Sequence, residues 1–202
     1  MKKVIAGAIL SVLSLSLPAL AANVERYQFK GQNASAYFSK YDNCSFSSIS
    51  VYAFTSRTKD NPGAPTEQMG ADLYYYNYNY CNGTYSSGYG SSPNANFTIN
   101  NNLNSASLTG TFSVYDYSSG TNKTVDVNLN WTGTDDYSSN SKNNNTYQTP
   151  TSIIRYSFKG DFRQAQVLGS AILDGTDLIA NTSDSYGYLN SSKSGSYVRT
   201  TR

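Results

Sequence analysis

The sequence contains no histidine, a single tryptophan and only two glutamates among its 202 residues. The absence of histidine excludes Ser-His-Asp and Cys-His catalysis, histidine-ligated zinc or haem, and histidine-based pH switching. Charged residues are also scarce, at 14 % against about 25 % in typical soluble domains. A low charge content can accompany disorder, but the 19 tyrosines argue for a folded chain.

An excess of charge of either sign is also missing. The formal charge is +2, and Lys2 and Lys3 lie at the extreme N-terminus. Without these two residues, 13 basic and 13 acidic residues remain, so the rest of the chain is neutral overall. Because nucleic acids and anionic membranes attract basic surfaces, this balance predicts that neither is a main partner.

Long apolar runs are absent after the N-terminal segment. That segment has a positive start, an apolar stretch that ends at Leu17, and then the small residues that a signal peptidase recognises. We predict a signal peptide over residues 1–21, with Ala22 as the alternative cleavage point, and a single β-domain over residues 22–202. An uncleaved membrane anchor is the competing interpretation, but the run is short for a span. The mature chain is expected in the periplasm or outside the cell, without a transmembrane segment.

Only two cysteines are present, Cys44 and Cys81. In an oxidising compartment, an isolated pair of this kind usually forms a disulfide. A redox-active dithiol is the alternative, but the C-x-x-C spacing typical of it is missing. We predict a structural disulfide, which closes a loop long enough to stabilise the fold by about 3–4 kcal/mol.

Alternation of apolar and polar residues replaces any helical periodicity in the rest of the chain. The clearest pattern runs from Val125 to Trp131, where the odd-numbered positions are apolar. A stretch from Ala106 to Val114 alternates in the same way, and a turn-rich link over 116–122 joins the two. These segments predict a long β-hairpin that places Trp131 in the core.

Shorter segments of the same kind predict further strands. They lie at 25–29, 36–38, 49–53, 153–158 and 162–171, and near Tyr186 and Tyr197, with a turn at Asp174-Gly175. The polar stretch from Asp135 to Thr149 is interpreted as a mobile loop. The whole pattern predicts an all-β fold, an antiparallel β-sandwich or barrel of about 9–10 strands. A small outer-membrane barrel is a weaker alternative, because most of the strands are too polar for a lipid-facing band.

The most unusual local feature is the run Tyr-Tyr-Tyr-Asn-Tyr-Asn-Tyr at 74–80. In a strand, the even-numbered positions of this run share one face. A row of phenol rings can stack on sugars, whereas the competing interpretation is a tyrosine-lined core or a half-exposed sheet face. The uncharged run is also a candidate edge for self-association. The candidate ligand-binding residues in it are Tyr74, Tyr76, Tyr78 and Tyr80.

Arg163 is the remaining candidate ligand-binding residue. Its guanidinium group can anchor an acidic or hydroxylated ligand through two parallel hydrogen bonds. The alternative is a strand arginine that pairs with a nearby carboxylate such as Asp161. Both interpretations remain open from the sequence.

Motifs for catalysis or metal binding are absent. The patterns G-x-S-x-G, H-E-x-x-H and the P-loop do not occur, and the carboxylates form no recognisable glycosidase pair. Asp135-Asp136 and the segment Asp174-Gly175-Thr176-Asp177 offer oxygen ligands of the kind that Ca²⁺ prefers, but turn chemistry accounts for the same residues. We therefore predict no enzyme activity, no metal site and no cofactor.

Several short motifs follow one another in the second half of the chain. They are Leu103-Asn-Ser-Ala106-Ser-Leu108, Val127-Asn-Leu-Asn-Trp131-Thr-Gly133-Thr, Phe162-Arg163-Gln-Ala165 and the turn Asp174-Gly175-Thr176. Over residues 103–198 this order resembles an uncharacterised family of exported bacterial β-rich proteins. The resemblance implies a β-fold and export. It supplies no catalytic residues, because the family has no assigned activity.

These patterns together predict a secreted, non-catalytic binding module. It would engage glycan, polysaccharide or another cell-surface polymer through its tyrosine-rich strand faces. The competing class is a structural or self-associating surface or matrix protein.

Overall fold

The computed structural model describes residues 23–200, in which every regular element is a β-strand. The ten strands are β1 (Asn23–Tyr41), β2 (Ser45–Asn61), β3 (Thr66–Asn79), β4 (Tyr85–Ser92), β5 (Asn96–Ile99), β6 (Ser105–Asp116), β7 (Thr121–Gln148), β8 (Ser152–Leu173), β9 (Thr176–Asp177) and β10 (Asp184–Thr200). All strand pairs are antiparallel. The predicted all-β, antiparallel fold is confirmed. The signal peptide predicted over residues 1–21 lies outside the described residues.

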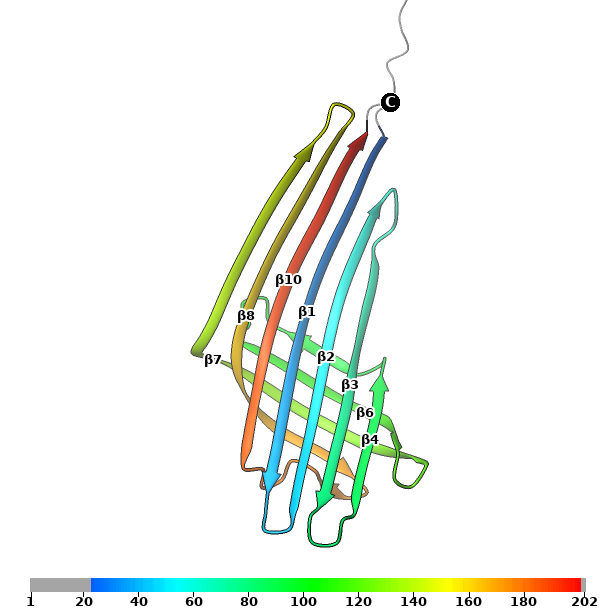
Figure 1. The fold of residues 1–202 in the computed structure, drawn as a ribbon, viewed down its shortest axis with the longest axis vertical. Helices are drawn as coiled ribbons and strands as arrows, with labels where there is room; N and C mark the ends of the chain where they lie inside the picture. Colours follow the sequence, from blue (N-terminus) through cyan, green and yellow to red (C-terminus); the bar gives the residue numbers. More distant parts are fainter. Residues whose placement is uncertain (1–22, 201–202) are drawn as a thin grey trace, which may run out of the picture.

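The strand pairings form a closed ring (Figure 1). The order along the sheet is β10-β1-β2-β3-β4-β6-β7-β8, and β8 pairs in turn with β10. In the lower half of Figure 1, the strands from β10 to β4 form a front layer, and β6, β7 and the end of β8 cross behind it. The lower halves of the strands therefore enclose a space between two layers.

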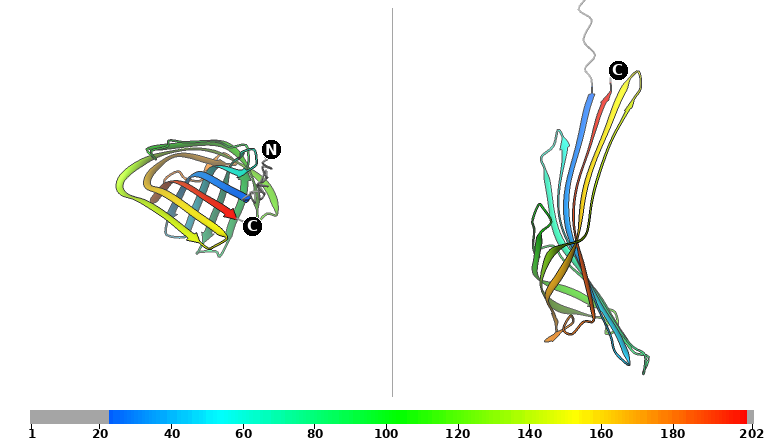
Figure 2. Two further views of the ribbon diagram at one scale, coloured as in Figure 1. Left: turned by 90° about the horizontal axis from the view of Figure 1, so that it is seen from above. Right: turned by 90° about the vertical axis from the view of Figure 1, so that its left-hand side faces the viewer.

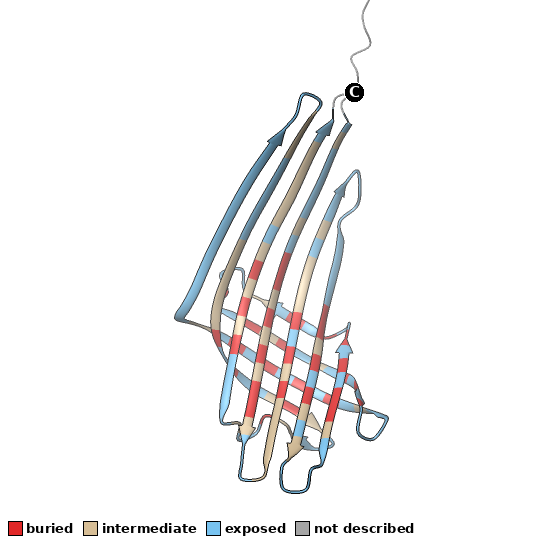
Figure 3. Cartoon of the chain, in the orientation of Figure 1, coloured by how far each residue is buried: buried red, intermediate tan, exposed pale blue. Residues whose placement is uncertain are grey.

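The buried apolar residues form one core between the two layers, and Figure 3 shows that the buried positions lie in this double-layered part. Buried positions alternate with exposed ones along each strand there, as the burial pattern of β6 illustrates. Trp131 is 1 % exposed, as predicted, and its indole N–H donates a hydrogen bond of 2.8 Å to the backbone carbonyl of Ser35 in the front layer. This bond ties the back layer to the front layer across the core.

A glycine lets the ring of strands close. Gly187 of β10 lies opposite Ala165 of β8, where the two layers meet. A Cβ atom at Gly187 would lie 2.3 Å from the side chain of Val167 and 2.9 Å from that of Trp131. Because only glycine lacks this atom, it allows β10 to approach β8 over the buried tryptophan.

Six strands continue beyond the core as a single layer, here called the extension (Figure 2). The extension comprises residues 23–30, 56–69, 138–161 and 192–200, and none of these residues is buried. Every buried apolar side chain lies in the rest of the described chain, which we call the core region. The fold is thus one sheet with a double-layered part and a single-layered part.

Long strands replace several shorter ones that the sequence predicts. The segments 25–29 and 36–38 both belong to β1, 153–158 and 162–171 to β8, and those near Tyr186 and Tyr197 to β10. The interpretation of Asp135 to Thr149 as a mobile loop is wrong, because residues up to Gln148 form the second half of β7. These errors have one cause: the inward positions change from apolar to polar where each strand leaves the core, so the alternation disappears.

The predicted covalent and turn features are confirmed. Cys44 and Cys81 form a disulfide with their Cα atoms 5.3 Å apart. This bond joins the turn after β1 to the turn after β3. Asp174 and Gly175 form the turn between β8 and β9 with φ angles of 49° and 78°, a conformation that glycine and aspartate tolerate.

Candidate functional site

The outward face of the front layer carries a shallow groove lined by tyrosines. The groove has a volume of about 380 Å³ and lies over β10, β1, β2, β3 and β4. Its tyrosines alternate with buried residues of the same strands, because successive residues of a strand point to opposite faces. We call it the tyrosine groove. Its lining tyrosines are Tyr37, Tyr52, Tyr74, Tyr89, Tyr186 and Tyr188.

Strand register brings these tyrosines together from distant parts of the chain. Tyr186 lies opposite Tyr37, and Tyr37 lies opposite Ser50. Beyond Ser50 the row continues through Tyr74 and then Tyr89. The rings of Tyr37 and Tyr186 are stacked, with centroids 5.0 Å apart and planes inclined by 27°. Four phenol rings therefore form one row across five adjacent strands.

Asp72 is the charged residue of the groove lining. It lies opposite Tyr52, and its Oδ1 accepts a hydrogen bond of 2.9 Å from the hydroxyl of Tyr89. The hydrogen bond to Asp72 raises the pKa of Tyr89. Burial, reinforced by the charge of Asp72, raises the pKa of Tyr52. Both phenols therefore remain neutral at physiological pH.

The predicted tyrosine run is divided between different environments. Tyr74 lines the groove, whereas Tyr75 points into the core and is 4 % exposed. Tyr76 lies outside the groove lining. Tyr78 and Tyr80 contact each other edge to face, with centroids 5.0 Å apart, beside the disulfide-linked turn. Of the four candidates from this run, only Tyr74 therefore belongs to the groove.

The same run does not lie at an edge of the sheet. β3 pairs with β2 over its whole length and with β4 from Ala71 to Tyr78. The hypothesis that this strip is an edge for self-association is therefore wrong, because its backbone is paired on both sides. The second half of β7, Ser138 to Gln148, pairs with β8 on one side and with no described strand on the other.

Arg163 holds an irregularity in β7 where the register shifts between Gly133 and Ser138. Its Nε donates a hydrogen bond of 2.9 Å to the carbonyl of Thr134, and one terminal nitrogen lies 2.7 Å from a carboxylate oxygen of Asp135. The other terminal nitrogen donates to the side chain of Asn104. All three nitrogens are engaged, and the residue does not line the tyrosine groove. Arg163 thus positions the junction between the core region and the extension, with Asp135 rather than Asp161 as its carboxylate partner.

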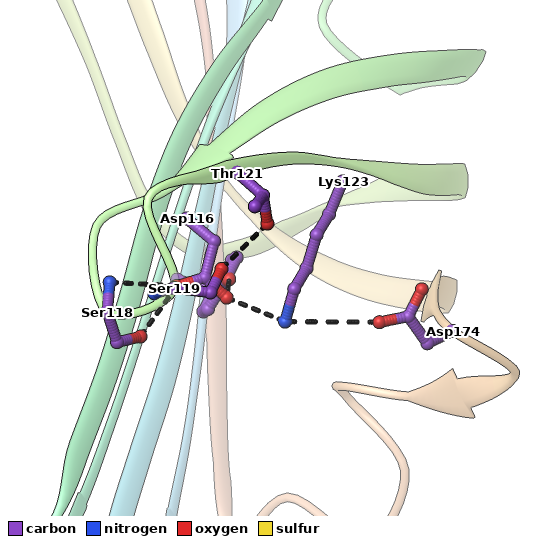
Figure 4. Close-up of polar contacts among 7 residues, drawn as sticks. Asp116, Ser118, Ser119, Thr121, Lys123 and Asp174 are labelled. Atoms are coloured by element: carbon purple, nitrogen blue, oxygen red, sulfur yellow. Dashed lines mark hydrogen bonds and ion pairs between the residues drawn. The ribbon is translucent and has the colours of Figure 1, made fainter.

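Asp116, at the end of β6, has the most strongly perturbed carboxylate (Figure 4). It is 2 % exposed and lies 2.7 Å from the ammonium group of Lys123. It also accepts hydrogen bonds from the hydroxyls of Tyr75 and Ser118. Lys123 and Ser118 hold the pKa of Asp116 well below its usual range, while burial and the bond to Asp116 raise the pKa of Tyr75. These groups satisfy one another, so the cluster stabilises the turn between β6 and β7.

Two of the acidic residues singled out from the sequence stabilise turns. Oδ1 of Asp177 accepts hydrogen bonds from the backbone amides of Ala171 and Ile179. Asp174 lies 3.9 Å from Lys123. In the described part of the chain, no three His, Cys, Asp or Glu side chains are grouped as a metal site would require. The same part contains no apolar helix of membrane-spanning length.

Of the tyrosines that line the groove, the sequence predicts only Tyr74. Tyr37 follows the buried Ala36 and Tyr52 follows the buried Val51, so each occupies an outward position that a strand pattern could have marked. Their proximity depends on register between strands that are far apart in the chain, and a single sequence does not contain this information.

No family model matches the sequence, and no curated protein or solved structure matches it. The resemblance of residues 103–198 to an exported bacterial family stays a prediction. The function of the groove has to be argued from its own geometry.

Proposed function

We propose that the protein is an exported, non-catalytic binding module that takes up a carbohydrate chain in the tyrosine groove. The observation that carries this proposal is the row of phenol rings contributed by β10, β1, β3 and β4. A groove on the face of a sheet is open along its length, so it suits a polymer better than a small enclosed ligand.

The chemistry of the lining suits a sugar. Each tyrosine ring offers an apolar surface for the C–H face of a pyranose, and its hydroxyl can exchange hydrogen bonds with sugar hydroxyls. Ser35 and Ser50 add small hydroxyl groups between the rings, and Asp72 adds a hydrogen-bond acceptor. Glycosidases use two carboxylates on either side of the scissile bond, and the lining contains one. The groove therefore supports binding rather than hydrolysis.

Export is part of the proposal. Residues 1–21 have the pattern of a signal peptide. The disulfide between Cys44 and Cys81 is compatible with an oxidising compartment, since such bonds persist mainly outside the cytosol. A module in the periplasm or outside the cell would meet polysaccharides of the cell surface.

A glycan-array screen of residues 22–202, purified with the disulfide formed, tests the proposal. The double variant Tyr52→Ala/Tyr74→Ala removes two rings of the groove. It should weaken binding roughly tenfold or more, because each aromatic contact contributes about 0.5–1.5 kcal/mol beyond its buried area. Tyr76→Ala/Tyr78→Ala alters the same run outside the groove and should leave the affinity nearly unchanged.

The matched control is Tyr85→Ala/Tyr147→Ala, which removes two tyrosines that are 59 % and 58 % exposed and do not line the groove. Circular dichroism checks that every variant is folded. The proposal is contradicted if no polymer on the array binds, or if binding survives in Tyr52→Ala/Tyr74→Ala.

A second candidate function, self-association, is favoured by the free edge of β7. Residues Ser138 to Gln148 present backbone N–H and C=O groups on a side that no described strand occupies. Such an edge can pair with a strand of another chain. This function predicts oligomers whose size rises with concentration in light scattering and does not change with free sugars. If light scattering shows only monomers at high protein concentration, self-association is contradicted.

A further inference from the structure

The basic residues of this neutral chain gather in the extension. The extension carries nine basic and four acidic side chains, whereas the core region carries three basic and nine acidic ones. All nine basic residues occupy the face that continues the inner face of the core region. They are Arg26, Lys30, Arg57, Lys59, Lys142, Arg155, Lys159, Lys193 and Arg199. The neutrality of the sequence as a whole therefore conceals a strongly basic surface.

Five of these residues form a row across five strands. Lys142 of β7 lies opposite Lys159 of β8, which lies opposite Lys193 of β10. Lys193 lies opposite Lys30 of β1, and Lys30 lies opposite Arg57 of β2. We call this row the cation ladder. With neighbouring strands about 4.8 Å apart, it extends over about 19 Å.

Carboxylates neutralise only part of the cation ladder. Arg57 lies 3.6 Å from Glu67, and Lys159 lies 3.0 Å from Asp161. The ladder cations that form no ion pair with a described carboxylate are Lys30, Lys142 and Lys193. Like charges placed directly opposite each other destabilise a sheet. Without a bound anion, the row therefore destabilises the fold. This cost indicates that the row serves to bind an anionic ligand.

The cation ladder lines a hollow of about 510 Å³. Uncharged polar side chains flank the cations there, among them Gln28, Asn144 and Ser157. Next along the same face of β1, Gln32 is buried, and its Nε2 has no hydrogen-bond partner among the described residues. Phe29 and Phe158 also line the hollow, which thus combines positive charge with amide, hydroxyl and aromatic groups.

From this arrangement we infer that the cation ladder binds a linear acidic polysaccharide whose negative groups lie across the strands. A polymer with regularly repeated carboxylate or sulfate groups complements a straight row of cations, and its hydroxyls complement the flanking amides and hydroxyls. The ladder and the tyrosine groove lie on opposite faces of the sheet. Binding at the ladder is therefore independent of binding in the groove.

Two other anionic partners fit this face less well. Single-stranded nucleic acids stack their bases on free aromatic rings. Tyr197 is the one aromatic residue that the register places on this face of the extension, and the guanidinium groups of Arg26 and Arg155 lie over its ring at 5.5 and 5.8 Å. Peripheral membrane sites combine basic residues with apolar ones that enter the lipid. Phe29 and Phe158 also line the hollow, but the register places them on the opposite face of the sheet from the ladder cations. A polysaccharide needs neither feature.

Titration of residues 22–202 with heparin and with polygalacturonate tests the inference. The wild-type protein should bind both polymers, and its affinity should fall roughly 100-fold between about 50 and 200 mM salt, as counterion release at about five contacts implies. The triple variant Lys30→Gln/Lys142→Gln/Lys193→Gln should bind at least about tenfold more weakly at low salt. The three lysines are exposed and form no ion pair with a described carboxylate, so the variant should fold, which circular dichroism verifies.

Matched controls separate the ladder from general charge and from the groove. Lys40→Gln removes one positive charge from the core region, and Lys193→Gln removes one from the ladder. Only the second change should weaken heparin binding. Conversely, Tyr52→Ala/Tyr74→Ala should leave heparin binding intact, and the triple lysine variant should leave binding of a neutral glycan intact.

Two outcomes would overturn the inference. One is the absence of heparin and polygalacturonate binding at low salt, or binding that the triple variant retains in full. The other is binding of oligo(dT) or of anionic phospholipid vesicles that depends on the ladder while neither polysaccharide binds.

Discussion

The core region and the extension belong to one sheet, yet different conditions shape their sequences. From Val125 to Trp131, one face of β7 is buried, and apolar residues alternate with polar ones. From Ser138 to Gln148, the same strand has both faces exposed and consists mainly of Ser, Asn and Thr. Antiparallel pairing with β8 continues through both segments. Strand pairing can therefore extend far beyond the point where burial ends.

The two parts are consequently stabilised by different interactions. Burial of apolar surface, at about 25 cal/mol per Å², stabilises the core region. The extension depends on backbone hydrogen bonds and on cross-strand pairs, each of which contributes about 0.2–1 kcal/mol. One such pair is Tyr147 and Tyr156, whose ring centroids lie 6.3 Å apart. Equivalent substitutions should therefore have unequal effects in the two parts.

The largest contrast is expected for phenylalanines. Phe112 is fully buried in the core region, so Phe112→Ala should lower the free energy of unfolding by about 3–5 kcal/mol. Phe158 in the extension is 43 % exposed, and Phe158→Ala should lower it by less than about 1 kcal/mol. Urea unfolding of both variants measures the difference. Equal losses would show that the extension is stabilised by burial after all.

The buried carboxylate gives the next contrast. Asp116→Asn removes the ion pair with Lys123 and should lower the free energy of unfolding by about 2–3 kcal/mol at neutral pH. Glu67→Gln, which alters an exposed ion pair of the extension, should change it by less than about 0.5 kcal/mol. Chemical denaturation of the two variants at the same pH provides the comparison.

The same carboxylate predicts how acid affects stability. The pKa of Asp116 is lowered in the folded protein, so its contribution is complete above about pH 4, the pKa of an unfolded aspartate. The contribution is lost as the pH falls below that value, because protons then bind preferentially to the unfolded chain. Wild type should lose stability on acidification more steeply than Asp116→Asn. Parallel curves for the two proteins would contradict this assignment.

Arg163→Ala tests the junction between the two parts. The variant loses the hydrogen bonds to Thr134 and Asn104 and the ion pair with the exposed Asp135. This loss should lower the free energy of unfolding by about 1 kcal/mol. The amides of β7 near the register shift should exchange with solvent faster than in wild type. Arg155→Ala, within the extension, is the control. Unchanged exchange in Arg163→Ala would mean that the irregularity is held by the backbone alone.

The smallest effect has the opposite sign. Lys193→Gln relieves repulsion with the two lysines opposite it, Lys30 and Lys159, and should raise the free energy of unfolding by about 0.2–0.5 kcal/mol at low salt without ligand. High salt should abolish the gain, because it screens exposed charges. Lys40→Gln should show no such gain. A loss of stability in Lys193→Gln would indicate that its aliphatic stem packs on the sheet.

The sequence predicts the strands correctly where one face of the sheet is buried, because apolar and polar residues then alternate along the strand. The hairpin from Ala106 to Trp131 and the disulfide were predicted correctly, because apolar alternation and an isolated cysteine pair are local signals. The extension lacks this alternation, since neither of its faces is buried. The second half of β7 consequently looked like a loop, although its backbone pairs as regularly as that of the first half.

The two proposed surfaces escaped prediction for separate reasons. The run at 74–80 contains tyrosines that are close in sequence, whereas Tyr37 and Tyr186 meet only through the pairing of β1 with β10. The cation ladder was hidden because net charge is summed over the chain and carries no information on position. Both surfaces depend on register, which sets which residues of distant strands lie side by side.

The unequal distribution of charge makes the elongated molecule an electric dipole. Its extension carries an excess of five positive charges, and its core region an excess of six negative ones. Near a polyanionic surface, long-range forces would turn the extension toward that surface before any contact forms, within the Debye length of about 10 Å at 0.1 M salt. The acidic core region would be repelled and held away. A protein attached in this orientation would leave its tyrosine groove accessible to a second polymer chain.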